Sequence, residues 1–374
     1  MWGFYKELKQ KSKWVKISLL ASFLQFAIVS ILEAIVLSKT LSDLRHTAEL
    51  LDTVHEKSKA LNDPSIYKDF YSLYKKQFSL PVYFSLFIFA QLFQFYLCFD
   101  GTINQNTMQI IVLACFNFLL WSYGGIQFYQ TTTASKDFNT FKMEKLSEID
   151  LQFSPIVIPI TLTIIFLLAA TSIFFSFIAH KLYQEYGWSL YKRIGADVQM
   201  KKMYKIYHVF VLILKLDVFF FLMFSGQLLF LVIIFSSAQD IIIHVIASIL
   251  IGSVLLVLAY WAVKNENRWG VISFIIGCIG TLGYFILKLV GIHLNVDHNN
   301  PVDDRYLGSR IFLTSFALLC IIFNISTMIV AFLCYKNFNR GLKHHINDSP
   351  RPDDILSVSH QPKNSRLPQR WSLE

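Results

Sequence analysis

Four ionisable side chains lie inside long apolar stretches of this sequence: Glu33, Lys215, Asp217 and Lys288. An unpaired charge at the centre of a bilayer costs at least about 2.5–3.5 kcal/mol, so such groups face the interior of a bundle, where they pair or line a pathway. Lys215 and Asp217 are two residues apart, which places them roughly 200° apart around a helix. Since they do not face each other, we expect each to contact a different neighbouring helix, unless the helix is broken there.

Partners for these charges are sought among polar residues at comparable depth in other apolar stretches. The candidates for Lys215 and Asp217 are Gln91, Asn117, His244 and Asn324. Lys215 lies ten residues after Lys205, or roughly 15 Å along a helix, which predicts a position near mid-membrane. Glu33 and Lys288 both lie toward the opposite membrane surface and form a candidate pair of their own. Lys288 could instead extend its long stem to the interface.

Motifs for catalysis are sparse. The sequence His298-Asn-Asn-Pro-Val-Asp303 has the H-x4-D spacing of some lipid acyltransferases, but a proline interrupts it and no second motif supports it. His293, Asp297 and His298 could bind a metal, yet such residues in a loop are more often solvated. No phosphate-binding Gly-rich loop, H-E-x-x-H or G-x-S-x-G occurs. We therefore expect no enzymatic activity, no catalytic residue, no metal and no cofactor.

The elements that must position these charges are long apolar helices. Of the 374 residues, 54% are hydrophobic and only 16% charged, against about 25% charged in a soluble domain. Eight runs reach the roughly 20 residues needed to cross a bilayer, and they are 17–38, 80–99, 108–129, 155–178, 206–235, 241–263, 270–292 and 311–335. Backbone groups in lipid must bond internally, so each crossing is expected to be a helix. The predicted fold is an all-α, polytopic integral membrane helix bundle of about eight transmembrane helices over 17–335, with seven as the alternative.

The distribution of Lys and Arg predicts the orientation. With both termini in the cytoplasm, the cytoplasmic segments carry 20 basic residues and the opposite segments 12. The C-terminal half follows the rule cleanly, whereas 39–79 carries seven basic residues on the non-cytoplasmic side, which keeps the seven-helix alternative open. The first run is longer than the apolar part of a signal peptide and is expected to be retained. The five cysteines lie in or beside apolar runs and are expected to be small buried side chains.

Three segments are expected outside the membrane. Residues 1–16 form a basic cytoplasmic N-terminus, and 336–374 form a basic cytoplasmic tail whose prolines and polar residues predict disorder. The insert 39–79 reads as two amphipathic helices broken at 62–64, with Leu41, Leu44, Ala48, Leu51 and His55 on the apolar face of the first. Acidic and basic residues lie elsewhere on that helix, namely Asp43, Arg45, Glu49, Asp52 and Glu56. The second helix carries an aromatic stripe made by Ile66, Phe70, Leu73, Tyr74 and Phe78.

The basic segments and the insert suggest which partners to expect. The net charge of +9 does not require a nucleic-acid partner, because the basic terminal segments can interact with an anionic cytoplasmic leaflet. No nucleic-acid-binding signature is present in the sequence. We therefore expect the lipid bilayer as a partner, and candidate protein partners at 39–79 and at the basic segment 181–205. Nucleic acid is not expected.

The segment GWSLYKRIGADVQMKKMYKIYHVFVLILKLDVFFF, residues 187–221, resembles a family of uncharacterised multi-pass Golgi apparatus membrane proteins of fungi. The residues that carry the resemblance are Gly187-Trp188, Tyr191-Lys192, Ile194 to Asp197, Lys215, Asp217 and Phe219 to Phe221. Leu216 and Val218 depart from the family, which has aromatic residues beside the aspartate. The resemblance implies a multi-pass protein of the Golgi membrane and carries over no catalytic residue, because no activity is assigned to the family.

Three functions compete on this sequence. The first is a structural or trafficking component that uses 39–79 and 181–205 as partner surfaces. The second is a transporter or channel that uses Glu33, Lys215 and Asp217. The third is a seven-helix receptor-like protein, against which the five lysines of 1–16 argue, because that architecture would place them outside the cytoplasm.

Overall fold

The computed structural model describes residues 11–145, 153–194, 198–235, 250–294 and 309–339 of the chain, and these residues form eight helices and no strand. The helices are α2 (Lys13–Ala60), α3 (Pro64–Ile103), α4 (Thr107–Lys145), α5 (Val157–Ile194), α6 (Val198–Phe235), α8 (Gly252–Lys264), α9 (Arg268–Leu294) and α10 (Arg310–Lys336). Seven of them are long and apolar enough to cross a membrane. The predicted all-α membrane bundle is confirmed. Of the predicted run 241–263, the structure describes only the part from Leu250 onward. This part forms the short helix α8.

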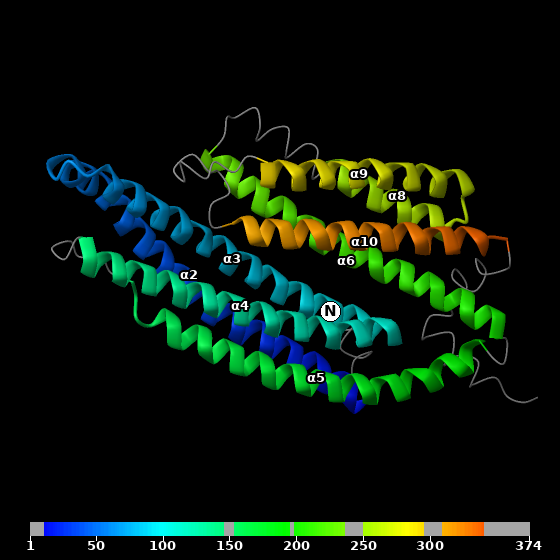
Figure 1. The fold of residues 1–374 in the computed structure, drawn as a ribbon. Helices are drawn as coiled ribbons and strands as arrows, with labels where there is room; N and C mark the ends of the chain where they lie inside the picture. Colours follow the sequence, from blue (N-terminus) through cyan, green and yellow to red (C-terminus); the bar gives the residue numbers. More distant parts are fainter. Residues whose placement is uncertain (1–10, 146–152, 195–197, 236–249, 295–308, 340–374) are drawn as a thin grey trace, which may run out of the picture.

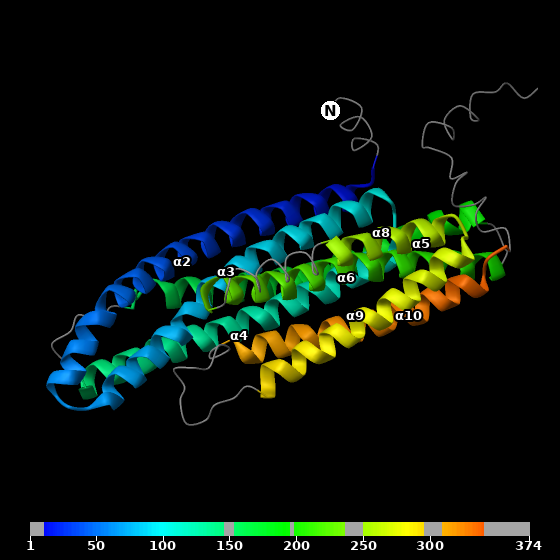
Figure 2. The ribbon, with the colours of Figure 1, turned by 90° about the horizontal axis from the view of Figure 1, so that it is seen from above.

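The bundle consists of two groups of helices (Figures 1 and 2). Helices α2 to α5 pack as one antiparallel group, while α8, α9 and α10 pack together with α6. Helix α6 also touches α3 and α4, so it connects the two groups. Aromatic side chains fill this junction, where the ring of Phe219 lies 4.4 Å from that of Phe93 and 5.3 Å from that of Phe116, centroid to centroid.

Helix α2 is uninterrupted for 48 residues because its sequence contains neither glycine nor proline. In its first half several large apolar side chains point outward, Leu20 being 60% and Ile31 62% exposed, while Ser22 and Glu33 are fully buried. An apolar exterior over a polar interior is stable in lipid and unstable in water. Past Ser38 the exterior changes, since charged side chains such as Arg45 and Glu49 become exposed. The change marks the point where α2 leaves the apolar layer.

The predicted insert 39–79 is therefore the continuation of two membrane helices. It comprises the end of α2, a turn at 61–63, and the start of α3. Pro64 begins α3, where its missing N–H costs nothing, and the Asp63 side chain caps the helix by accepting from the Ser65 N–H at 2.9 Å. The end of α4 packs on this hairpin, forming a small apolar core of Val54, Ile66, Phe70, Leu73, Phe138 and Phe141.

The buried face of residues 39–60 is rotated by part of a helical turn from the face that the sequence predicted, so that prediction is wrong. Leu41 is 37% exposed, and Asp43, expected on the polar face, is buried. The reason is a specific polar partner: the two oxygens of Asp43 accept from the N–H and the hydroxyl of Ser154, at 2.8 and 2.7 Å, just before α5 begins. This contact rotates α2 so that Thr40, Asp43 and Thr47 face inward.

The basic segment 181–205 is largely helical. Helix α5 continues to Ile194 and α6 starts at Val198, with 195–197 outside the described residues. The start of α2, the end of α5, the start of α6 and the end of α10 lie at the same end of the bundle (Figures 1 and 2). That end is the one that the basic-residue distribution predicts to be cytoplasmic.

Candidate functional site

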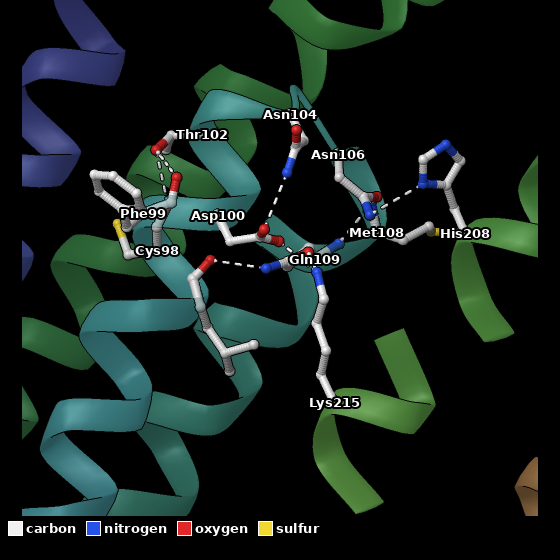
Figure 3. A network of polar contacts seen from close by, with 11 residues as sticks. Cys98, Phe99, Asp100, Thr102, Asn104, Asn106, Met108, Gln109, His208 and Lys215 are labelled. Carbon is white, nitrogen blue, oxygen red and sulfur yellow. Dashed lines mark hydrogen bonds and ion pairs between the residues drawn. The ribbon is translucent and has the colours of Figure 1, made fainter. Parts of the chain in front are cut away.

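A polar network joins α6 to the turn between α3 and α4 (Figure 3). The Lys215 ammonium donates to the Asp100 carboxylate, forming an ion pair, and to Oε1 of Gln109 at 3.2 Å. About one-fifth of each charged side chain is exposed, 20% for Lys215 and 21% for Asp100. The pair therefore brings together three helices and neutralises both charges at the junction of the two groups.

The turn is built to hold Asp100 in place. Asn104 ends α3 and its amide donates to the second carboxylate oxygen of Asp100 at 3.0 Å. Gln105 has a positive φ of 49°, which reverses the chain. The ends of α3 and α4 then approach so closely that a Cβ at Gly101 would lie 3.2 Å from Gln109 Cγ and Ile110 Cδ1. A Cβ at Gly101 would therefore push these two side chains aside by a few tenths of an ångström, and glycine fits the close approach of the two helices.

Gln109 and Asn106 extend the network in two directions. The Gln109 amide donates to the Leu97 carbonyl at 3.1 Å while its oxygen accepts from Lys215. The oxygen of Asn106 accepts from the backbone N–H of Met108 at 3.1 Å and caps α4. Its amide nitrogen lies 3.3 Å from Nδ1 of His208 on α6. His208 and Lys215, which lie two helical turns apart on α6, therefore both contact the loop between α3 and α4 and its flanking residues.

Asp217 lies in the other group of helices. Its carboxylate accepts a hydrogen bond from the Thr327 hydroxyl on α10. A small cavity of about 50 Å³ lies beside it, lined in part by Thr281, Cys278 and Asn324. The Asn324 amide donates to the Thr281 hydroxyl at 2.7 Å, so α6, α9 and α10 share one partly buried polar patch beside an apolar core.

Glu33 belongs to a third set of contacts, a buried seam of amides between α2, α3 and α4. The Gln127 amide donates to both oxygens of Glu33, at 3.2 and 3.0 Å. Earlier on α2, the Gln25 amide donates to Gln91 at 3.2 Å and to Asn117 at 2.9 Å. These five side chains are at most 2% exposed. The seam runs through the part of the bundle whose exterior is apolar.

The structure thus separates residues that the sequence grouped. Lys215 and Asp217 contact neighbours on different sides, but their partners are Asp100, Gln109 and Thr327, none of which we predicted. Among the predicted partners, Gln91 and Asn117 lie in the Glu33 seam, Asn324 lies beside Asp217, and His244 is outside the described residues.

The predicted Glu33–Lys288 pair is wrong for the contacts that the structure describes. The Lys288 ammonium lies 5.7 Å from the ring centroid of Tyr284, one turn earlier on α9. Helix α9 packs against α8 and α10, whereas Glu33 faces α4.

Lys215 also lies nearer an end of the bundle than we predicted. The ten residues between Lys205 and Lys215 had suggested a position near mid-membrane. Asp100 is three residues before the end of α3, which is about 5 Å along the helix. Helix α6 simply begins well beyond the α3–α4 turn.

Candidate metal ligands are only partly described. His293 lies 3.0 Å from the Thr314 hydroxyl, while Asp297, His298 and Asp303 fall outside the described residues. Within the described ranges, no group of three or more His, Cys, Asp or Glu side chains could hold a metal.

Comparison with known proteins gives one informative relative. The chain is 25% identical over 286 residues to a UPF0658 Golgi apparatus membrane protein of Schizosaccharomyces pombe, an alignment that covers 71% of this chain and 78% of the relative. No model of a known protein family matches, and no solved structure matches. The resemblance to uncharacterised fungal Golgi membrane proteins is confirmed over most of the chain, and with it the predicted Golgi membrane localisation.

Proposed function

We propose that this chain is a structural or trafficking component of the Golgi membrane. The observation that carries the proposal is that Glu33, Lys215 and Asp217 occupy three separate sets of contacts. Glu33 joins α2 to α4, Lys215 joins α6 to α3 and α4, and Asp217 joins α6 to α10. A transport path along these three charges would require them to line one continuous cavity, whereas each is engaged by its own partner.

Two surfaces outside the apolar layer support a role in assembly. One is the helical extension formed by the end of α2, the start of α3 and the end of α4, which has its own apolar core and exposes charged side chains such as Arg45, Glu49, Asp52 and Glu56. The other is formed by the end of α5 and the start of α6, at the opposite end of the bundle. A helical extension with its own core and a charged exterior suits reversible docking of a protein partner.

The test separates folding from partner binding. Replacing the four exposed charges by Ser removes the charged surface and leaves the core of the extension intact. A trafficking or scaffolding role predicts normal abundance together with a smaller native complex or a changed distribution among Golgi membranes. Four substitutions to Ser at exposed basic residues outside the extension, Lys13, Lys16, Arg268 and Lys336, serve as the control. If both variants keep wild-type complexes and distribution, the extension is not a partner surface.

A transporter remains the second candidate because of the Glu33 seam. Among the described residues, Gln25 Oε1, Gln91 Nε2 and Gln127 Oε1 are buried without a hydrogen-bond partner. Spare donors and acceptors along an apolar bundle are what a proton or solute path needs. A proton or cation flux in liposomes that Gln25→Leu abolishes, at normal protein abundance, would favour this function over the structural one.

A further inference from the structure

A cleft opens beside the Lys215 network, where the α3–α4 turn, the end of α5 and the start of α6 meet. Its volume is about 390 Å³. The turn contributes one wall with Asn106 and Thr107, α5 contributes Tyr183 and Tyr186, and α6 contributes a row of basic side chains. The hydroxyl of Tyr186 donates to the Thr102 carbonyl at 3.4 Å, so the wall made by α5 is attached to the end of α3.

The charge in the cleft has one sign. Lys201, Lys202 and Lys205 of α6 line it together with His208, and no acidic side chain is among its lining residues as the structure describes them. Lys202 and Lys205 are exposed and one turn apart. Both ammonium groups can therefore point at one bound anion. Amides and hydroxyls complete the lining, and these groups donate hydrogen bonds to oxyanions.

The cleft also receives the start of a long helix. Helix α4 has 39 residues and begins at Thr107, which lines the cleft. The N-terminus of a helix carries a partial positive charge that favours anions. Asn106 fixes this end of α4 by accepting from Met108 and by contacting His208. The positive helix end and the α6 lysines thus line the same cleft.

We propose that this cleft binds a phosphate-bearing anion, presented either as the headgroup of an acidic phospholipid or as a soluble phosphorylated compound. Lysine is a point charge suited to phosphate, and the tyrosines provide flat apolar contacts for the group that carries it. The cleft lies at the end of the bundle predicted to be cytoplasmic, where basic pockets between membrane helices meet anionic headgroups. The site is separate from the protein-docking surface of the α2–α4 extension.

Binding of three probes to the full chain in a neutral detergent tests the proposal and distinguishes the two sources. The probes are a short-chain phosphatidylinositol monophosphate, the same headgroup without acyl chains, and short-chain phosphatidylcholine as the neutral control. Binding of the first alone supports a lipid headgroup site, and equal binding of the first two supports a soluble phosphate ligand. Equal binding of the phosphorylated lipid and phosphatidylcholine, or binding of none, overturns the proposal.

Two kinds of variant then place the site in the cleft. Lys202→Gln with Lys205→Gln should weaken binding at least tenfold, whereas the same charge loss at Lys264 and Lys336, on other helices at this end, should change it less than twofold. Gly187 lines the cleft, and a Cβ there would meet nothing within 4 Å. Gly187→Leu should therefore occlude the site while every lysine is kept, and Gly125→Leu, also unobstructed, is its control. Equal effects of cleft and control variants would overturn the assignment.

Discussion

Removal of either member of the Lys215–Asp100 pair should destabilise the bundle by more than a surface ion pair could. The perturbations are Lys215→Gln and Asp100→Asn, singly and together. Each single change leaves one charge about four-fifths buried at the junction of the two helix groups, facing Gln109 and Asn104 in place of an opposite charge.

The size of the effect follows from the burial of the pair. At a separation of about 4 Å and an effective dielectric constant of about 20, the attraction is about 4 kcal/mol. Breaking a fully buried pair costs about 3–5 kcal/mol, and breaking an exposed pair about 0.2–1 kcal/mol. With neighbouring amides still bonding to the remaining charge, we expect about 2–3 kcal/mol for each single variant. The double variant should cost no more than the worse single one, which corresponds to a coupling energy of about 2 kcal/mol.

Reversible unfolding in mixed micelles, followed by circular dichroism, provides the free energies for this double-mutant cycle. The exposed pair between Lys76 and Asp137, at 3.4 Å and with side chains 48% and 35% exposed, is the internal control and should show coupling below about 1 kcal/mol. Strictly additive effects of Lys215→Gln and Asp100→Asn, or single effects below about 0.5 kcal/mol, would refute the assignment of this pair as the junction.

Three further predictions concern the other contacts. Glu33→Gln should leave protein abundance within about twofold of wild type, because the new amide oxygen still accepts from Gln127. Glu33→Leu should lower abundance, because it leaves the buried Gln127 amide without an acceptor. Equal abundance of the two variants would contradict this contact. Thr327→Val should cost about 1–2 kcal/mol of unfolding free energy by removing the donor to Asp217, and Thr327→Ser should restore most of it, a rescue whose absence would show that the hydroxyl is not the cause. Phe70→Ala should cost about 3–5 kcal/mol locally, seen as faster hydrogen exchange in 50–75 with unchanged exchange in α9 and α10; uniform acceleration throughout the bundle would show that the extension has no core of its own.

The apolar runs predicted the membrane helices well, because a long run without helix breakers has few alternatives in lipid. The length of α2 was missed, since nothing in the sequence stops it at Ser38 and the helix continues to Ala60, whereas the runs 270–292 and 311–335 match α9 and α10 to within two residues. Pro64 correctly placed the start of α3. The inner face of the extension was missed because Asp43 is held by Ser154, 111 residues away, and long-range polar contacts leave no mark on local periodicity.

The divergence of the contacts of Lys215 and Asp217 followed from helix geometry, but the identity of their partners did not. We searched only within apolar runs, whereas Asp100 adjoins the end of the run 80–99 and was assigned to a loop. A carboxylate immediately after an apolar run, facing a lysine about two and a half turns inside another, is the feature that could have found it. The Glu33–Lys288 pairing failed because complementary charge and similar depth do not determine which helices are neighbours.

Crosslinking within the folded chain tests most directly whether α6 is joined to the α3–α4 turn. In a chain whose native cysteines are replaced by alanine, Asp100→Cys and Lys215→Cys would be treated with a short bismaleimide in native membranes and cut at a protease site engineered near residue 150. We predict that the two fragments stay covalently joined, while Glu33→Cys with Lys215→Cys gives free fragments, because Gln127, the partner of Glu33, lies eighteen residues beyond Gln109 along α4. Free fragments from the first pair, at full modification of both cysteines, would contradict the account.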